Sequence, residues 1–582
     1  MYKLSYSQLG YRPGSQKLLS LVVDPEKSGE LPGKIPFYVR NLFDRIPREN
    51  THPKGWDGSF FNWPFDLTKG KLLPEQANIQ YQGELVRQDT RWGTFWQGSF
   101  DAFQGSGQFQ VETDYACSFP FLISDNLYDR LQYGYLNYLY CQRSGFMNPG
   151  LREATHLDDG KLDTTDEHIN AVGGWYDAGD YRKWMFLTHP NMETLAQLME
   201  RGHPGLREKI LSEIEWGNKF FHSMITAEGQ VWEDLGGGTL KPGLDYDKDW
   251  WFENHPGCNC YESEEERSIR TNYNPSVQFM FVRIQAYLAK VLEGSASEKC
   301  LELARRAWEY GIKRGHDRRT LFVSEQLWAA INLKDVCPEA VDNTVIEALV
   351  RELISLQDSG DDGLYGYFME KDESDGFRCI AMACEPVMAL LRLVELNPAE
   401  LKASVDAAKD SVRRYIDGFV LADAKSNSFS YPPYGVYVNP ENKELQTFRD
   451  AGRGRFVRSF LHPLNSQQIA HGCGGVALHQ AVVCAKAGNL MSETGWQDQA
   501  ERIIQWTLGH NPQALCMHSG VGHRFPTPFS QYVLRLPDTL SVGHNGRPDD
   551  TPYVEESELI EWCTQEIWDI PHGYLAQAVL WV

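Results

Sequence analysis

The sequence predicts a protein of two parts, in which a small antiparallel β-sandwich precedes a large helical domain. A chain of 582 residues is too long to fold around one hydrophobic core, so two or more domains are expected. Short β-rich runs separated by Pro, Gly and Asn fill the first ~120 residues. From Asp125 onward, hydrophobic residues recur with a helical period. The change falls between residues 114 and 126 without a low-complexity linker, so we expect domains at residues 1–122 and 123–582.

Four runs of the N-terminal part are expected as strands. They are short and β-rich, and turn residues such as Gly10-Tyr-Arg-Pro-Gly14 separate them. This part has no cluster of acidic residues or histidines, so we expect it to have a structural role. The expected strands are Leu18 to Val23, Phe37 to Val39, Gly107 to Val111 and Phe119 to Ile123.

The C-terminal part contains about a dozen segments with helical periodicity. The segment at 345–354 is typical, because Asp342-Asn343-Thr344 ahead of it can cap a helix. Long loops rich in Gly, Asp and aromatic residues join the segments, and such loops on a helical scaffold usually carry the functional site. The other expected helices lie near 127–139, 192–200, 206–222, 276–292, 297–313, 324–334, 379–396, 402–417, 467–486, 497–508 and 573–581.

Composition and charge argue against several classes of partner. The net charge of 56 − 79 = −23 disfavours binding to nucleic acid or to an anionic membrane. The 17 Trp and 27 Tyr include more aromatic side chains than the core needs, and such rings stack on the apolar faces of sugars. The acidic field suits neutral or cationic ligands.

The twelve cysteines are scattered singly, which does not suggest a disulfide framework and fits a reducing compartment. The first ten residues lack the apolar run of a signal peptide, and no stretch is apolar enough to span a bilayer. We expect a cytoplasmic protein without membrane association. The sequence does not predict its oligomeric state.

Two aspartates in the run Gly173-Gly174-Trp175-Tyr176-Asp177-Ala178-Gly179-Asp180 are the strongest candidates for catalysis. In so tight a loop, both carboxylates can point at one small volume, where they can bind and deprotonate a water molecule. Trp175 and Tyr176 are expected to form an apolar wall or floor beside them and to contact the substrate. The alternative is a surface turn rich in Asp and Gly, which the preceding aromatic pair disfavours.

Hydrolysis of an acetal also needs an acid that protonates the leaving oxygen. Composition alone does not choose among the acidic residues near the C-terminus. Glu566 differs from the others because it lies between Trp562 and Trp568, where partial burial would raise its pKa. Pro571 indicates the start of the final helix. The acidic candidates are Asp549, Asp550, Glu555, Glu556, Glu558, Glu561, Glu566 and Asp569.

The run at 173–180 resembles the signature of glycoside hydrolase family 9, whose best-known members are cellulases. Three shorter motifs occur in the same order as in that family. The resemblance covers almost the whole chain and implies an (α/α)6 barrel preceded by an immunoglobulin-like β-sandwich. The supporting motifs are Gln142-Arg143-Ser144-Gly145, Ser324-Glu-Gln-Leu-Trp328-Ala-Ala and Leu508-Gly-His-Asn511-Pro512.

The resemblance also implies roles for three residues. Asp180 would be the general base, Asp177 would orient the water, and Glu566, in Gln565-Glu566-Ile567, would be the general acid. The family works by single displacement with inversion at the anomeric carbon, which requires about 6.5–9.5 Å between base and acid. Ser144 replaces a cysteine that binds zinc in some members, so that zinc site should be absent.

The chain departs from the family where cellulases contact sugar hydroxyls. The Pro-His-His-Arg-like stretch is missing from residues 517–530, and Ile570 and His572 replace the Asp and Asn that usually follow the acid. Histidines cluster in sequence around the expected acid instead, and we expect one or two to line the pocket. The candidates are His518, His523, His544 and His572, of which His518, His523 and His572 are the predicted substrate contacts.

These departures favour an exo-acting enzyme with a pocket, because a polymer cannot enter the cytoplasm whereas short oligosaccharides can. The chain resembles the cytoplasmic exo-β-D-glucosaminidases of marine bacteria, which act on chitin- or chitosan-derived oligosaccharides. A cationic amino sugar would suit the acidic stretch Asp158, Asp159, Asp163, Asp166 and Glu167, although such a run is usually a solvated face. Cello-oligosaccharide hydrolysis (endoglucanase or cellobiase) and a non-catalytic oligosaccharide-binding protein remain alternatives.

Two further features lie in the loop that follows residue 240. Trp250 and Trp251, with Phe252 and Tyr246, are candidate sugar-stacking residues, although core packing is equally compatible with each. His255, Cys258 and Cys260 are spaced irregularly for zinc, and no second close pair is evident. We predict no metal or cofactor. A metal-dependent hydrolase that uses these three residues is the third hypothesis.

Overall fold

The computed structural model describes most of the chain and separates it into two units. Residues Met1–Leu127, Gln505–Cys516 and Val521–Arg524 form the first unit, and the remaining described residues form the second. The predicted domain boundary at residue 122 stays a prediction. The described residues are 2–41, 79–148, 151, 156–157, 159–165, 167–236, 267–360, 362–371, 375–440, 443–461, 471–530, 536–557 and 561–582.

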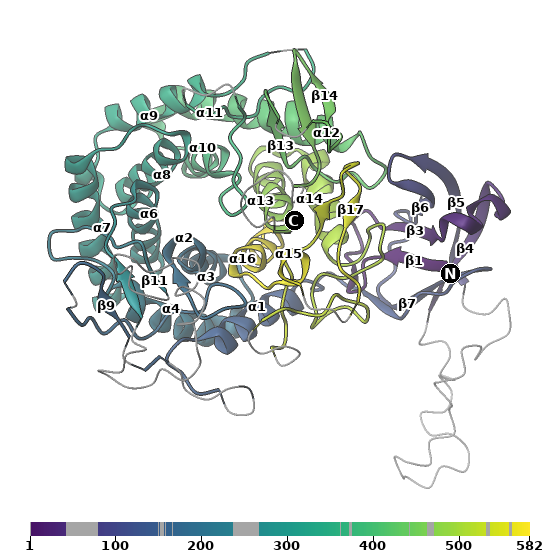
Figure 1. Cartoon of the computed structure of the whole chain (residues 1–582), viewed down its shortest axis with the longest axis horizontal. Helices are drawn as coiled ribbons and strands as arrows, with labels where there is room; N and C mark the ends of the chain where they lie inside the picture. Colours follow the sequence, from purple (N-terminus) through teal and green to yellow (C-terminus); the bar gives the residue numbers. More distant parts are fainter. Residues whose placement is uncertain are drawn as a thin grey trace, which may run out of the picture. The chain divides into compact units, whose positions relative to one another are not determined.

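The first unit contains one hydrogen-bonded sheet of eight strands, in the order β1-β3-β6-β5-β4-β7-β8-β2 (Figure 1). All neighbouring strands are antiparallel except β2 and β8. The strands are β1 (Tyr2–Tyr6), β2 (Gly10–Tyr11), β3 (Leu18–Val23), β4 (Lys34–Asn41), β5 (Ile79–Thr90), β6 (Gly93–Ser99), β7 (Gly107–Thr113) and β8 (Phe121–Ile123).

Alternation along the strands creates the core of this unit. In β4, Ile35, Phe37 and Val39 are buried while the residues between them are half-exposed, as expected for a strand with one face inward. Side chains from β1 to β8 meet in one hydrophobic cluster that includes Trp96. The indole of Trp96 donates a hydrogen bond to the Pro32 carbonyl at 2.6 Å, which satisfies its buried N–H.

Three strands expected from the sequence are confirmed within β3, β4 and β7, and the fourth, Phe119 to Ile123, is confirmed from Phe121 onward as β8. The prediction omitted the long β5–β6 hairpin. Its signal was present, because Ile79, Tyr81 and Leu85 share one face of β5 and the turn before Gly93 joins it to β6. Gly83 interrupts that alternation, which weakens the period-two pattern.

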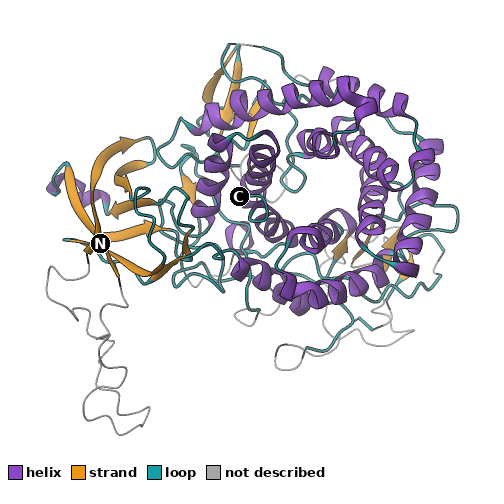
Figure 2. Cartoon of the chain, turned by 180° about the vertical axis from the view of Figure 1, so that it is seen from behind, coloured by secondary structure: helices purple, strands orange, loops and turns teal. Residues whose placement is uncertain are grey.

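Six helices of the second unit contact one another in a closed ring within the described residues, in the order α3-α6-α8-α10-α13-α16. Figures 1 and 2 show this ring nearly end-on, surrounded by a second layer of helices. The inner helices are α3 (Pro190–Arg201), α6 (Pro275–Val291), α8 (Thr320–Val336), α10 (Glu385–Leu396), α13 (Gly474–Met491) and α16 (Asp569–Ala578). The outer layer contains α1 (Asp129–Gln142), α4 (Arg207–Phe221), α7 (Gly294–Arg314), α9 (Asn343–Ser355), α11 (Lys402–Tyr415) and α14 (Thr494–Thr507).

The sequence explains which helices lie inside. In α6 the buried residues run without interruption from Ser276 to Ala289, so every face of this mainly apolar helix is enclosed. In α7 only one stripe is buried, from Cys300 to Gly311. Inner and outer helices alternate along the chain, so the inner helices run in the same direction and their N-terminal ends share one end of the barrel.

Buried ion pairs join the inner helices. Arg283 of α6 forms salt bridges with Glu193 of α3 and with Glu325 of α8, the latter at 2.6 Å, and all three side chains are nearly inaccessible. Removing one partner from such a group typically costs about 3–5 kcal/mol, because a buried charge is left uncompensated.

The expected helices are confirmed with small shifts in their ends, except near residues 467 and 379. The helix expected at 467–486 is α13, which runs from Gly474 to Met491, and residues 467–470 lie outside the described residues. The other exception lies near residue 379. There the helix begins at Glu385, because Pro386 occupies its first turn and residues 379–384 form a loop. The final helix begins at Asp569 and has Pro571 in its first turn, as predicted. No described helix is both long and apolar enough to cross a membrane.

Candidate active site

The loop at 173–180 is fixed in place by its glycines. Gly173 and Gly174 have φ of 103° and 67°, a region that L side chains rarely adopt. A Cβ at Gly173 would lie 2.6 Å from the Cβ of Lys219 and 2.8 Å from the Trp216 carbonyl. The backbone N–H of Gly174 donates to that carbonyl at 3.1 Å. Only glycine therefore lets the loop pack directly on α4.

Trp175 and Tyr176 anchor the loop from below. Both are fully buried. The Trp175 indole donates to Glu213 Oε2 at 3.0 Å, and Glu213 pairs with Arg143 at 2.8 Å. The two rings therefore pack in the core beneath the aspartates that follow, and their predicted contact with substrate stays a prediction.

Asp177 and Asp180 lie side by side above this anchor. Asp177 is 3% exposed, and its Oδ2 accepts a hydrogen bond from the Trp184 N–H at 2.6 Å. Asp180 accepts from the Arg182 N–H at 3.1 Å, and its other oxygen lies 3.4 Å from Arg182 Nε. Each aspartate thus has one defined protein partner, and Asp180 additionally faces a cation.

The surroundings of the two aspartates shift their pKa values to different extents. Burial, followed by the charge of Asp180, raises the pKa of Asp177 well above its usual value. Burial also raises the pKa of Asp180, but the Arg182 guanidinium opposes this shift, while Glu566 adds to it. Burial thus raises the pKa of both carboxyls, and the rise is larger for Asp177 than for Asp180.

Glu566 lies between two other segments of the chain. The Glu566 backbone bridges to Phe529, and its carbonyl accepts from the Val542 N–H at 2.8 Å. Its Oε2 receives two contacts, from His471 Nε2 at 2.8 Å and from the Trp568 indole N–H at 2.9 Å. Oε1 has no hydrogen bond within the described residues, so it is the oxygen left to face a ligand.

His471 is a site residue that sequence analysis missed. Its position in the sequence could have indicated this role, because His471 lies directly before α13 and the loops before the inner helices α3 and α16 carry the other site residues. Its ring also lies 4.4 Å from that of Trp568. The two side chains together fix the orientation of the Glu566 carboxyl.

Gly179 brings the acid close to the aspartate loop. A Cβ at this position would lie 2.7 Å from the Phe529 carbonyl and 3.3 Å from Glu566 Cγ. The smallest residue is therefore needed between Asp177 and Asp180, because any side chain would push the loop away from the Glu566 segment.

Gly179→Ala should lower kcat by about tenfold to a hundredfold, because displacing a catalytic group by about 1 Å costs that much. We expect a smaller loss of stability, about 1–3 kcal/mol, from overpacking. Steady-state kinetics and urea unfolding measure the two effects. Gly495→Ala is the control, because a Cβ there meets nothing within 4 Å; equal kinetic effects of both variants would contradict the prediction.

A buried hydrogen-bond network joins the two candidate catalytic segments, the loop at 173–180 and the Glu566 segment. Gln142 Nε2 donates to the Ala178 carbonyl at 2.8 Å and also lies within bonding distance of the Tyr138 hydroxyl. Tyr138 donates to Asp569 Oδ1 at 2.8 Å. The backbone N–H of Asp569 donates to the Asp177 carbonyl at 3.0 Å. Asp569 is three residues beyond Glu566, so the network fixes the loop and the acid relative to each other.

Burial raises the pKa of Asp569 to about 7, although hydrogen bonds from Tyr138 and Asn191 oppose the shift. In the unfolded chain this carboxyl titrates near 3.8. Between pH 4 and pH 7 the native state therefore binds more protons than the unfolded state. The stability that Asp569 contributes should be present below pH 4 and lost as the pH rises through 7.

Asp569→Asn should flatten this dependence. We expect the difference in unfolding free energy between wild type and variant to change between pH 5 and pH 8 in the variant's favour, as measured by urea unfolding. Asp410→Asn, at an exposed position of α11, controls for a change in net charge. A constant difference across that range would show that Asp569 does not titrate there.

Comparison with known proteins identifies the family. The pattern of Glycosyl hydrolase family 9 matches residues 128–539. The chain belongs to glycosyl hydrolase family 9. It is therefore a glycoside hydrolase by family, and its second unit is the (α/α)6 barrel of that family.

Solved structures of family 9 share this fold. One is a metagenome-derived endoglucanase, with a TM-score of 0.68 and 16% identity over 100% of this chain and 99% of that chain. Another is a thermostable endoglucanase from Alicyclobacillus acidocaldarius, with a TM-score of 0.66 and 16% identity over 99% of both chains. At this identity the likeness extends to the fold alone.

Curated relatives match over shorter segments. Endoglucanase C of Cellulomonas fimi is 30% identical over 169 residues, which are 22% of this chain and 15% of that protein. Endoglucanase 16 of Oryza sativa subsp. japonica is 32% identical over 108 residues, which are 18% of this chain and 20% of that protein. The chain thus spans a fifth or less of the length of these relatives.

The predicted histidine contacts of this family 9 protein have different surroundings, and their contact with substrate stays a prediction. His518 and His572 are 0% and 1% exposed, and their rings pack together at 5.0 Å. His523 lies in the first unit, stacked on Phe119 at 3.9 Å. His544 is also buried. Clustering in sequence therefore does not translate into a common pocket, because the segment between residues 517 and 544 contributes to both units.

Two acidic residues of the stretch before the signature have structural contacts, whereas Glu167 is exposed. Asp159 is buried and pairs with Arg267 at 2.6 Å, and Asp163 accepts a hydrogen bond from the Thr271 hydroxyl at 2.7 Å. Trp250, Trp251 and the residues His255, Cys258 and Cys260 lie outside the described residues, so their predicted roles stay predictions. Among the described residues, no group of three or more His, Cys, Asp or Glu side chains could hold a metal.

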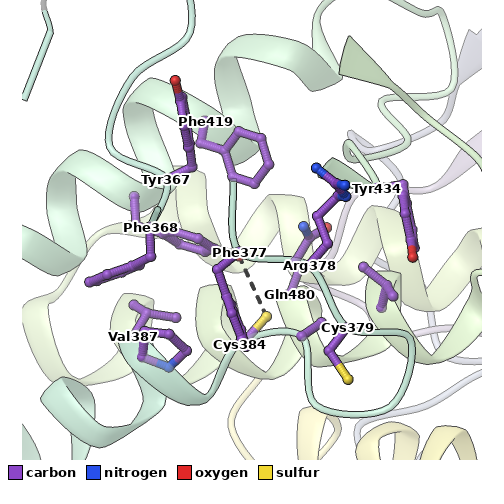
Figure 3. Close-up of a pocket in the computed structure, with 14 residues that line it drawn as sticks. Tyr367, Phe368, Phe377, Arg378, Cys379, Cys384, Val387, Phe419, Tyr434 and Gln480 are labelled. Carbon is purple, nitrogen blue, oxygen red and sulfur yellow. Dashed lines mark hydrogen bonds between the residues drawn. The ribbon is translucent and has the colours of Figure 1, made fainter. Parts of the chain in front are cut away.

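Two cavities adjoin the N-terminal end of α10. The one in Figure 3 is lined by Tyr367, Phe377, Phe419 and Tyr434 around Cys384 and has a volume of about 20 Å³. That volume holds a water molecule but not a sugar ring. The other measures about 650 Å³ and extends from Phe186 to Met382, which is within the usual range for a ligand site.

Proposed function

We propose that this family 9 chain is an inverting glycoside hydrolase that cleaves β-1,4-linked oligosaccharides. The observation that carries the proposal is the arrangement of Asp180 and Glu566, which influence each other electrostatically across Gly179. A charged carboxylate beside a cation suits a general base. A carboxyl with one free oxygen, held by two N–H groups on the other, suits a general acid.

In the proposed reaction, Asp180 removes a proton from a water molecule that Asp177 helps to orient. The water oxygen bonds to the anomeric carbon as the bond from that carbon to the glycosidic oxygen breaks. Glu566 transfers its proton from Oε1 to the leaving oxygen. The resulting carboxylate is stabilised on Oε2 by the N–H groups of His471 and Trp568. A single displacement of this kind inverts the anomeric configuration.

For the substrate, we propose deacetylated chitin oligosaccharides, from which the enzyme would release glucosamine at the non-reducing end. The net charge of −23 favours a cationic sugar over an anionic one. The missing Pro-His-His-Arg-like stretch argues against the usual cellulose contacts.

Hydrolysis of a β-1,4-glucan is the second candidate function. The curated relatives are named endoglucanases, and one solved neighbour, with a TM-score of 0.66, is in complex with cellobiose-like isofagomine. A non-catalytic oligosaccharide-binding protein is disfavoured, because such a protein could lose any of Asp177, Asp180 and Glu566 without penalty.

An NMR time course with two substrates in parallel tests these alternatives. The substrates are the disaccharide of β-1,4-linked glucosamine and cellobiose. Faster cleavage of the amino sugar with α-anomer as the first product would support the inverting exo-glucosaminidase. Cleavage of cellobiose alone would support the same mechanism with a glucan substrate. If the first product were the β-anomer, the inverting mechanism would be wrong. No cleavage of either disaccharide would favour a binding protein.

We also propose that the eight-stranded unit is an immunoglobulin-like module with a structural role and that the protein works in the cytoplasm. The absence of acidic or histidine clusters among its expected strands supports the first proposal. The ten described cysteines form no disulfide with one another, which supports a reducing environment.

A further inference from the structure

The cavity of about 650 Å³ lies at the N-terminal ends of three consecutive inner helices. Pro275 begins α6, Phe322 is in the first turn of α8, and Met382 lies just before α10; all three line the cavity. The catalytic loop precedes α3 and Glu566 precedes α16. Because the inner helices run in the same direction, the cavity and the catalytic residues occupy the same end of the barrel.

Two adjacent residues connect the cavity to the catalytic loop. The N–H of Trp184 donates to Asp177 Oδ2 at 2.6 Å, and the next N–H, of Met185, donates to the Glu233 carbonyl at 3.3 Å. Phe186 follows and lines the cavity. Asp177 and the backbone carbonyl of Glu233 therefore accept successive N–H groups of the same short segment, so residues 184–186 join the candidate catalytic loop to the wall of the cavity.

Glu233 is the acidic residue of this cavity. Its two oxygens accept hydrogen bonds from the side-chain amides of Asn272 at 3.1 Å and Asn274 at 3.0 Å. Asn274 is itself fixed, because its carbonyl oxygen caps the N-terminus of α6 at Ser276. The Glu233 carboxylate forms no salt bridge with any described residue, and a carboxylate can accept about four hydrogen bonds. It is thus held in one orientation, with no cationic side chain paired to it among the described residues.

The other lining residues suit a sugar ring. Phe186, Tyr273 and Phe322 supply aromatic faces, on which the apolar face of a pyranose can stack. Arg314, the cation of the lining, lies with its guanidinium 5.6 Å from the centre of the Tyr273 ring. The Arg314 guanidinium therefore faces an aromatic ring and does not pair with Glu233. The hydrogen-bond partners of the Glu233 carboxylate are the neutral amides of Asn272 and Asn274.

We propose that this cavity is the subsite that recognises the ammonium group of an amino sugar, with Glu233 as the specificity-determining residue. The inference rests on the proposed function, since it assigns the substrate class to a residue. An ammonium would donate to the free lone pairs of Glu233 and supply the missing positive charge. A neutral hydroxyl at the same position would gain only an ordinary hydrogen bond, so the cavity would favour glucosamine over glucose.

Glucosamine and glucose, titrated separately by NMR at pH 6, test the proposal without turnover. We expect Glu233→Gln to weaken the Kd for glucosamine by about tenfold, as for loss of one charge-assisted hydrogen bond, and to leave that for glucose unchanged. Glu228→Gln is the matched control, since Glu228 is an exposed glutamate five residues earlier on the same segment and should behave as wild type.

Three outcomes would overturn the proposal: equal affinities of wild type for the two sugars, an unchanged glucosamine Kd in Glu233→Gln, or equal losses for both sugars. The last would show a structural role for Glu233. The proposed function fails separately, if the wild type cleaves cellobiose but not the glucosamine disaccharide. Charge-dependent glucosamine binding by that enzyme would still establish the subsite.

Discussion

Asp180→Asn should lower kcat by about a hundredfold to ten-thousandfold, which is the usual contribution of a general base. The asparagine has the same shape, and its amide oxygen can accept the Arg182 N–H hydrogen bond that Asp180 now accepts. The variant should therefore fold normally and bind oligosaccharide with an affinity close to that of wild type. What it lacks is an acceptor for the proton of the attacking water.

Steady-state kinetics on the preferred disaccharide measure this loss, and titration of the same sugar measures binding. Asp410→Asn, which removes an exposed carboxylate from α11, should have wild-type kinetics. A kcat within tenfold of wild type in Asp180→Asn would show that another group is the base. A lost affinity together with a lost rate would show instead that Asp180 mainly holds the substrate.

The sequence predicted the parts of the fold that depend on local periodicity. Continuous burial from Ser276 to Ala289 and a single stripe in α7 both follow from residue order, so the helices were recognised before their arrangement was known. The closed ring was not a consequence of periodicity. It came from the family resemblance, because periodicity shows that a helix is enclosed but not by which neighbours.

The candidate site was predictable to a similar extent. Asp177, Asp180 and Glu566 occur in recognisable motifs, whereas His471 reaches Glu566 only through tertiary structure. The burial of Trp175 and His518 was also not predicted from the sequence. Aromatic and histidine side chains near catalytic motifs serve equally well in the core and in a pocket, and only packing distinguishes the two uses.

Glu233 shows why specificity is harder to read from a sequence than catalysis. It is one of many acidic residues in the chain, and its neighbours in sequence carry no motif. Only the structure shows that its hydrogen-bond partners are the neutral amides of Asn272 and Asn274, about forty residues later, and that no described cation pairs with it. From the sequence alone, the next residue, Asp234, would have been an equally reasonable candidate for the specificity residue. In the structure, however, Asp234 is paired with the cation of Arg270.

Glu566→Gln should have an effect that depends on the leaving group. A glutamine cannot supply the proton, so cleavage of a disaccharide, whose sugar leaving group is poor, should slow by about a hundredfold to ten-thousandfold. An aryl glycoside with an acidic phenol as leaving group does not need that proton, and we expect it to be cleaved within about tenfold of the wild-type rate.

The structure indicates that Glu566→Gln removes the acidic proton without disturbing the neighbouring contacts. The introduced glutamine can turn its amide oxygen toward His471 and the Trp568 indole, which now contact Oε2 of Glu566, and place its NH2 where Oε1 stands. The surrounding geometry is then retained while the acid is lost. Rates on both substrates, measured beside Glu228→Gln, test the role. Equal losses on the two substrates would mean that Glu566 organises the site without donating a proton, since a group that only positions the sugar serves every leaving group alike.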